Sequence, residues 1–222
     1  MIQLKNVVAG YRGGQQDILN GLTLSVEKGE FAVIESATGS GKSTLMRLLT
    51  GELDPSSGEI VVAGERLSDL SNRNVARYRR SIGMVFQDFK LLEDKTVEEN
   101  VSFALEVLSK VGRYDMSTKV SAALDRVGLY SQKHCFPNAL SMGEQQRVAI
   151  ARAIVREPLV LLADEPTGQL DHEASRGILD ILNTENLRGM TVLVTTSQRG
   201  LMPENPRIKR FALEGGQTRS LA

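Results

Sequence analysis

The sequence is poor in cysteine: Cys135 is its single thiol in 222 residues. One thiol cannot form an internal disulfide, which excludes the small secreted domains that disulfide bonds hold together. This cysteine usage suits a reducing compartment. We interpret Cys135 as a small side chain that fills space in the core, because nothing near it in the sequence marks it as a nucleophile.

The sequence also has no excess of charge of either sign. Lys plus Arg and Asp plus Glu each number 27, so the formal net charge is zero. A basic surplus would attract the phosphate backbone of a nucleic acid, and this chain has none. We therefore expect no nucleic-acid partner.

Long apolar runs are missing as well. No run reaches the length needed to cross a bilayer. Met1 leads directly into a strand-like segment, without the pattern of a secretory leader. We therefore expect a soluble cytoplasmic chain, for which a role at a membrane requires a partner.

Length and composition favour a folded α/β protein. The hydrophobic content of 41% is enough for a real core and argues against disorder. A chain of 222 residues suits one α/β domain that has room for a helical insertion.

The most informative stretch is a glycine-rich loop that follows the apolar run 31–34 and precedes a short helical pattern over 45–49. It reads Ser36-Ala37-Thr38-Gly39-Ser40-Gly41-Lys42-Ser43-Thr44. In such a loop, backbone N–H groups can point at phosphate oxygens, and the helix N-terminus and Lys42 add positive charge. Ser43 can offer its hydroxyl to a magnesium ion that bridges two phosphates. The stretch predicts a phosphate-binding loop.

Ser36 departs from the motif G-x-x-x-x-G-K-S/T, which has glycine at this first position. If the position requires a positive φ angle, a residue other than glycine costs about 1–2 kcal/mol there. We therefore expect weakened loop geometry rather than loss of the site.

Apolar runs and alternating patterns predict strands separated by turns. The first two strands are expected to be antiparallel and to lie beside the core sheet, with a turn at Gly13-Gly14 between them. The run 208–213 is expected to be an edge strand before the turn at Gly215-Gly216. The predicted strands cover residues 2–8, 22–26, 31–34, 59–62, 82–86, 159–163, 191–195 and 208–213.

Helical patterns predict two capping boxes, one at Thr96 with Glu99 and one at Ser141 with Glu144. The stretch from about 96 to 138 is mostly helical, and we expect it to be a helical subdomain inserted into a core formed by 1–95 and 139–222. The predicted helices cover residues 72–80, 96 to about 108, 117–127, 141–156 and 173–186.

Two carboxylates, Asp164 and Glu165, directly follow the apolar run 159–163, which suits the centre of a parallel sheet. Ligands of open α/β sheets bind at this end of the strands. Asp164 can hold a magnesium ion, directly or through water, and Glu165 can orient or deprotonate an attacking water.

Together these elements resemble the nucleotide-binding subunit of ABC transporters, over nearly the whole chain. The further matches are Tyr11, Gln87 (Q-loop), 140–145 (signature), 161–165 (Walker B) and 168–171 (D-loop). The resemblance implies an α/β P-loop NTPase core with a mostly parallel sheet, an N-terminal antiparallel β subdomain and an inserted helical subdomain. Within the family the chain is most similar to cell-division ATPases. Lipoprotein-release and macrolide-export ATPases share much of the likeness.

The resemblance also implies ligands and partners. ATP with Mg²⁺ would lie between the phosphate loop of one subunit and the signature of the other in a homodimer. A membrane partner would dock near Gln87 and the helical subdomain and hold the dimer on the inner face of the cell membrane. Catalytic roles fall to Glu165, Ser197 and Gln87, and metal contacts to Ser43, Gln87 and Asp164. The ATP-binding residues are Tyr11, Ser36, Thr38, Gly39, Ser40, Gly41, Lys42, Ser43, Thr44, Ser141, Gly143, Glu144 and Asp171.

Two further departures from the family pattern bear on hydrolysis. Met142 replaces a signature glycine at a position that varies in the family. More seriously, Ser197 stands where the family has a histidine that contacts the γ-phosphate. The two histidines, His134 and His172, lie elsewhere, and we interpret His172 as a solvated surface residue. Removing one preorganised donor costs about 10²–10³ in rate, so we expect slow hydrolysis with nucleotide binding retained.

Three functions stay open at this point. The first is an ATPase that drives a membrane partner in cell division. The second is an ATP-gated dimer with negligible turnover, which Ser197 favours and Glu165 argues against. The third is the ATPase of a lipoprotein or macrolide exporter.

Overall fold

The structure is a computed structural model of the whole chain. It describes all residues except 12–16, 107–111, 199, 201–206 and 222. Gly13 and Gly14 of the predicted first turn lie outside the described residues. Within the described part of the chain, no helix is both long enough and apolar enough to span a bilayer.

Two sheets form the framework. The larger has the strand order β10-β9-β3-β8-β7-β6 and is parallel except for the β9–β10 pair. Its strands are β3 (Phe31–Glu35), β6 (Ile82–Val85), β7 (Val160–Asp164), β8 (Thr191–Thr196), β9 (Ile208–Glu214) and β10 (Gln217–Leu221). The smaller is antiparallel, with the order β2-β1-β4-β5. It contains β1 (Ile2–Ala9), β2 (Leu19–Val26), β4 (Ser57–Val62) and β5 (Glu65–Arg66).

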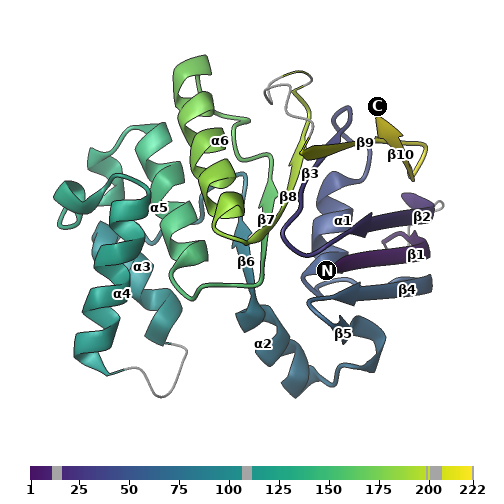
Figure 1. Cartoon of the computed structure of the whole chain (residues 1–222), viewed down its shortest axis with the longest axis horizontal. Helices are drawn as coiled ribbons and strands as arrows, with labels where there is room; N and C mark the ends of the chain where they lie inside the picture. The colour runs from purple at the N-terminus through teal and green to yellow at the C-terminus, as the bar shows by residue number, and fades with distance from the viewer. Residues whose placement is uncertain (12–16, 107–111, 199, 201–206, 222) are drawn as a thin grey trace.

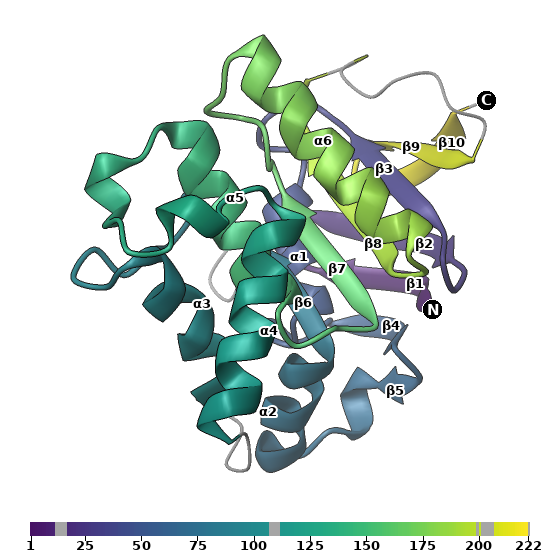
Figure 2. The ribbon, with the colours of Figure 1, turned by 60° about the vertical axis from the view of Figure 1, so that its left-hand side comes forward.

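Helices cover both faces of the larger sheet (Figure 1). Helix α1 (Lys42–Leu49) packs between the two sheets, while α5 (Met142–Ile154) and α6 (His172–Leu187) pack on the opposite face. Helices α3 (Val97–Glu106) and α4 (Arg113–Arg126) lie beside α5 (Figure 2). Helix α2 (Asn72–Ser81) leads into β6.

Alternation along the central strands divides the core in two. Phe31 and Val33 of β3 point into the core under α5 and α6, whereas Ala32 and Ile34 point into the core around α1. Successive side chains of a strand face opposite sides of a sheet, so one fully buried strand serves both cores. The expected α/β fold with an antiparallel β unit beside a mostly parallel sheet is confirmed.

Several local predictions are confirmed. Thr96 Oγ1 accepts the N–H of Glu99, whose Oε2 accepts the N–H of Thr96, which completes the first capping box. Strand β7 has parallel neighbours on both sides. The thiol of Cys135 is free and packs, partly buried, against the core.

Two predictions need correction. The segment 208–213 is not an edge strand, because β10 pairs with β9 beyond Gly215-Gly216 and forms the edge itself. Only Leu221 of β10 is strongly apolar, so this strand lacks a hydrophobic signal. Helix α4 begins at Arg113, four residues before the predicted start at Ser117.

Candidate active site

The glycine-rich loop joins the end of β3 to the start of α1, as the sequence predicts. Gly39 and Gly41 have φ angles of 81° and 104°. At Gly41 a Cβ atom would lie 2.9 Å from side-chain carbons of both Ile18 and Leu19. Glycine is therefore required at Gly41 for backbone conformation and for space.

Ser36 does not carry the backbone strain that its departure from the motif suggests. Its φ angle is not positive, and its N–H donates to the carbonyl of Thr196 at 3.0 Å. The Ser36 hydroxyl lies 2.5 Å from that of Ser40, inside the loop. The expectation of weakened loop geometry is therefore wrong in its physical premise, and Ser36 instead braces the loop.

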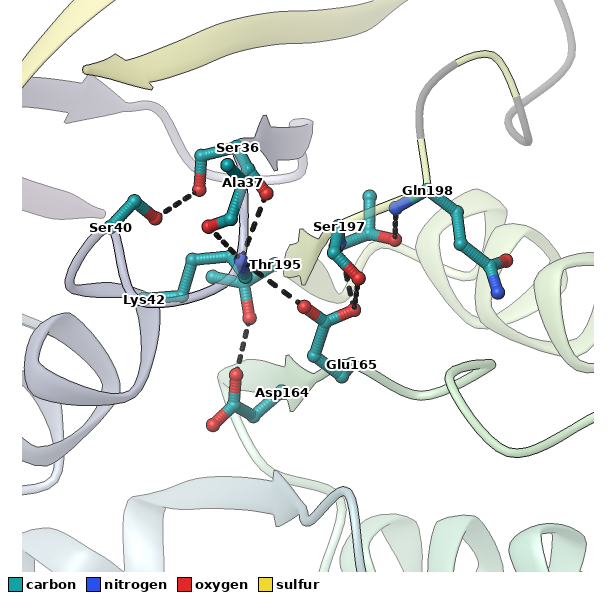
Figure 3. Close-up of polar contacts among 10 residues, drawn as sticks. Ser36, Ala37, Ser40, Lys42, Asp164, Glu165, Thr195, Ser197 and Gln198 are labelled. Carbon is teal, nitrogen blue, oxygen red and sulfur yellow. Dashed lines mark hydrogen bonds and ion pairs between the residues drawn. The ribbon is translucent and has the colours of Figure 1, made fainter.

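Lys42, at the start of α1, is buried with only 6% of its surface exposed. Its Nζ donates to the carbonyls of Ser36 and Ala37, each at 2.9 Å, and lies 3.3 Å from Glu165 Oε1 (Figure 3). The ammonium is thus held at the centre of the loop, where an anion can reach it.

Glu165 is held at both carboxylate oxygens. Oε1 faces Lys42, and Oε2 accepts the backbone N–H of Ser197 at 2.8 Å and its hydroxyl at 3.2 Å (Figure 3). Its φ angle of 46° is uncommon for a residue other than glycine. The carboxylate is mostly buried, and it is oriented by residues that lie 123 and 32 positions away in sequence.

Asp164 is the last residue of β7 and is 9% exposed. Its Oδ1 accepts the hydroxyl of Thr195, from the neighbouring strand β8, at 2.6 Å. Thr195 was not predicted as a site residue. Its sequence signal is weak, because threonine is common in buried strands.

An open pocket of about 320 Å³ brings most of the predicted residues together. Its lining consists of Ile18, Thr38, Gly39, Gly41, Lys42, Ser43, Thr44, Gln87, Glu165 and Ser197. An adjoining pocket of about 330 Å³ shares Ser43 and Gln87 with it and adds Asp164 to its lining. The loop of β3–α1 and the ends of β6, β7 and β8 therefore converge on one site.

The donor set of the adjoining pocket suits magnesium. The Ser43 hydroxyl, the Gln87 amide and the Asp164 carboxylate all offer oxygen, the ligand atom that Mg²⁺ prefers. The described residues contain no group of three or more His, Cys, Asp or Glu side chains that could hold a metal ion.

Tyr11 lies on the side of α1 and does not line the phosphate pocket. Its hydroxyl is 3.4 Å from Thr44 Oγ1 and accepts from Arg47 at 3.2 Å. The Arg47 guanidinium lies 5.6 Å from the centre of the Tyr11 ring, which is 42% exposed. Adenine stacking on Tyr11 stays a prediction.

The starts of α5 and α6, which carry Ser141 of the signature and Asp171 of the D-loop, adjoin each other; neither residue lines a pocket around the phosphate loop, whereas Gln169 of the D-loop lines the adjoining one. Ser141 caps α5 with a complete capping box, and the two hydrogen bonds from Ser141 lower the pKa of Glu144. Asp171 caps α6 by accepting the N–H of Ala174 at 2.8 Å. A Cβ atom at Gly143 would lie 3.1 Å from that of Ala174, so glycine permits close packing of the two helix starts.

Neither histidine enters the pocket. His172 is exposed at the start of α6, as expected. His134 is also exposed, and its Nδ1 lies 3.0 Å from Glu98. Among the described residues, the lining of the phosphate pocket contains Ser197 and no histidine.

Comparison with known proteins places these features in a family. The ABC transporter family matches residues 19–168. The cell division ATP-binding protein FtsE of Mycobacterium tuberculosis is 48% identical over 88% of this chain and 85% of its own length. FtsE of Escherichia coli K12 is 47% identical over 91% of this chain and 90% of its own length. A solved ATP-binding cassette, dimeric in a post-hydrolysis state with ADP and Pi bound, is 31% identical. The structural alignment covers 100% of this chain and 99% of the solved chain, with a TM-score of 0.88.

The match spans the loop, Gln87, the signature and the Asp164-Glu165 pair, and the solved cassette shares the fold over the full length. The chain therefore belongs to the ABC transporter family, and within it to the cell division ATP-binding proteins of the FtsE type, which makes it an ABC-type ATPase.

Proposed function

We propose that the chain binds and hydrolyses ATP with magnesium as the ATP-binding subunit of a cell-division membrane complex. The observation that carries this proposal is the shared lining of one pocket by Lys42, Gln87, Glu165 and Ser197. The loop N–H groups and Lys42 would bind phosphates, and Ser43, Gln87 and Asp164 would hold the metal. A bound magnesium ion would supply positive charge that neutralises the phosphates.

In this proposal Glu165 activates the attacking water. Its Oε1 lies 3.3 Å from Lys42 Nζ at the pocket, and a carboxylate oxygen in such a position can accept a proton from water. A γ-phosphate that binds Lys42 would weaken the ion pair of Lys42 with Glu165 and leave Oε1 free to face a water. Ser197 would keep Oε2 in place during this exchange, through its N–H and its hydroxyl.

Lys42→Ala tests the phosphate loop. The variant removes the full positive charge from the loop, and we expect ATP binding to fall below detection in isothermal titration calorimetry. Lys28→Ala is the matched control, because Lys28 is exposed at a turn outside the pocket. A dissociation constant for ATP that is unchanged in Lys42→Ala would refute the assignment.

A homodimer is supported by the position of the signature. Ser141, Gly143 and Glu144 are absent from the lining of both pockets around the phosphate loop. The N-terminus of α5 and the exposed Met142 are thus available to a second copy. A relative of the same fold is dimeric. Each ATP would then lie between the loop of one subunit and Ser141 of the other.

Glu165→Gln tests the dimer, since it removes the base and leaves the binding groups in place. With MgATP we expect this variant to sediment as a dimer and to hydrolyse ATP about 10²–10⁴-fold more slowly than the parent. Adding Ser141→Arg to Glu165→Gln should restore the monomer. If the double variant still dimerises, the signature is not at the interface.

The proposed docking surface for an FtsX-like integral membrane partner is a groove lined by Phe86, the residue before Gln87, and by Ala104 of α3 in the helical block 96–138. It has a volume of about 220 Å³ and apolar walls at Met84, Phe86 and Ala104. Arg79, Arg152 and Arg156 also line it, against one carboxylate, Glu52, so the charge of the lining is mainly positive. The guanidinium groups of Arg79 and Arg152 donate to backbone carbonyls. Such a groove favours a partner segment that is apolar with an acidic side chain.

Ala104→Glu tests this docking surface. It places a bulky acid on the groove wall, and we expect the co-expressed membrane partner to be lost on purification in detergent, with ATP binding retained. The matched control is Ser102→Glu, on the same helix and outside the groove. If Ala104→Glu copurifies with the partner as well as the control does, the partner docks elsewhere. Docking would hold the chain on the inner face of the membrane.

A second candidate function is an ATP-gated dimer with negligible hydrolysis. Ser197 favours it, because this residue lines the pocket and is a shorter donor than the histidine that the family resemblance would place there. The two candidates differ in the steady-state rate of phosphate release, measured with and without the membrane partner. A rate that stays at the background level under both conditions would favour the switch.

A further inference from the structure

Thr195 is a buried polar residue inside the core sheet. It is 0% exposed on β8, whose residues 192–194 are all apolar and buried. A valine would fill the same space, because both side chains are branched at Cβ. The hydroxyl is therefore the part of Thr195 that packing does not explain.

The hydroxyl is used on Asp164. The two residues are register partners on the adjacent parallel strands β7 and β8, and Thr195 Oγ1 lies 2.6 Å from Asp164 Oδ1 (Figure 3). An ionised carboxylate only accepts, so the threonine donates. A short bond between a hydroxyl and a carboxylate is among the stronger hydrogen bonds in proteins.

Thr195 contacts the second acidic residue through its backbone. Its carbonyl accepts the N–H of Glu165 at 2.9 Å, at the point where Glu165 has its positive φ angle. One residue of β8 thus holds Asp164 by its side chain and the backbone of Glu165 by its carbonyl. A substitution at Thr195 that keeps the strand changes only the first of these contacts.

We propose that Thr195 is a positioning residue for the metal-binding carboxylate. Its hydroxyl donates to Oδ1 and so fixes the rotation of the Asp164 side chain. The other carboxylate oxygen, Oδ2, then faces the adjoining pocket, which Ser43 and Gln87 also line. Groups that orient a metal ligand commonly change metal affinity about 10–100-fold when they are removed. The proposal rests on the proposed magnesium role of Asp164.

The test measures metal dependence separately from nucleotide affinity. ATPγS binding is titrated against free Mg²⁺, and again in EDTA, for the parent and for Thr195→Val. We expect the half-saturating Mg²⁺ concentration to rise about 10–100-fold in Thr195→Val. Affinity in EDTA should stay at the parent's value, because the loop and Lys42 are untouched. Thr195→Ser restores the hydroxyl and should restore the parent's Mg²⁺ dependence.

Thr191→Val is the matched control. Thr191 is equally buried on the same strand, and its Oγ1 accepts the N–H of Gly29 far from the pocket. We expect this variant to keep the parent's Mg²⁺ dependence. If Thr195→Val fails to fold, Thr195→Ala makes the same comparison in a smaller side chain.

Four outcomes would overturn the proposal. In the first, Thr195→Val shows the parent's Mg²⁺ dependence. In the second, Thr195→Ser is as impaired as Thr195→Val, which would make packing the cause. In the third, affinity in EDTA falls by the same factor. The fourth comes from Asp164→Asn: if this variant also shows the parent's Mg²⁺ dependence, the proposed magnesium role itself fails. If Asp164→Asn is impaired and Thr195→Val is not, only the positioning role fails.

Discussion

Replacing Ser197 by histidine exchanges one hydrogen bond for another. Ser197 holds Glu165 Oε2 with its N–H at 2.8 Å and its hydroxyl at 3.2 Å. Ser197→His keeps the first bond and removes the second. The Ser197 side chain lines a pocket of about 320 Å³, which has room for an imidazole. The new side chain can donate to charge that develops on the γ-phosphate, which the serine is too short to reach without a bridging water.

The magnitude follows from the two bonds. A hydrogen bond to a charged group is worth about 1.5–3 kcal/mol. The 3.2 Å hydroxyl bond is long, and two contacts to Glu165 remain, so we take the lower value, about tenfold in rate. One preorganised donor at the transition state contributes about 10²–10³. Ser197→His should therefore raise kcat about 10–100-fold, with little change in the affinity for ATP.

The assay is steady-state phosphate release at saturating MgATP. Ser197→Ala is the control, because it removes the hydroxyl and adds no donor; we expect its kcat to fall about tenfold. The reasoning is refuted if Ser197→His is no faster than the parent while Ser197→Ala equals the parent. It is also refuted if the parent already turns over at about 1–10 s⁻¹, an ordinary rate for an enzyme.

Three further predictions concern stability. Ser36→Gly should leave turnover unchanged, because Ser36 has no positive φ angle for glycine to relieve. It should lower the free energy of unfolding, measured in urea, by about 1.5 kcal/mol, because the bond to Ser40 is lost and the unfolded chain gains entropy. Glu185→Gln should lower the free energy of unfolding by about 3 kcal/mol, because it leaves the guanidinium of Arg126 without its buried carboxylate; denaturation that matches the parent would contradict this. The lowered pKa of Glu144 stabilises the fold above the carboxyl's unfolded pKa of about 4.3, and this contribution is lost as pH falls through the folded value. The melting temperatures of the parent and Glu144→Gln should therefore become equal as the pH is lowered into the acid range. A difference in melting temperature that stays constant with pH would contradict this role of Glu144.

Features that depend on a short stretch of chain could be predicted from the sequence. The phosphate loop is one, because its glycines, Lys42 and Ser43 are contiguous and lie between a strand and a helix. The two capping boxes are another, since each joins residues three positions apart. The Asp164-Glu165 pair follows the same rule, because a carboxylate after a fully buried strand has to lie at the end of the sheet.

Edge position could not be predicted in the same way. Whether 208–213 forms the edge depends on a later segment, and Gln217–Leu221 has too few apolar residues to indicate a strand. The motif also could not predict the φ angle of Ser36, because the backbone N–H of Ser36 bonds to the carbonyl of Thr196, which is distant in sequence.

The sequence by itself determined which chemical groups are present and in what local setting: a phosphate loop, capped helices and acids at a strand end. Only the tertiary structure decided how those groups are held. The bonds from Thr195 to Asp164 and from Ser197 to Glu165 span 31 and 32 residues, and the ion pair of Lys42 with Glu165 spans more. These contacts exist because parallel pairing brings the ends of β3, β7 and β8 side by side, and the order of strands in a sheet is set by packing of the whole chain rather than by any local pattern.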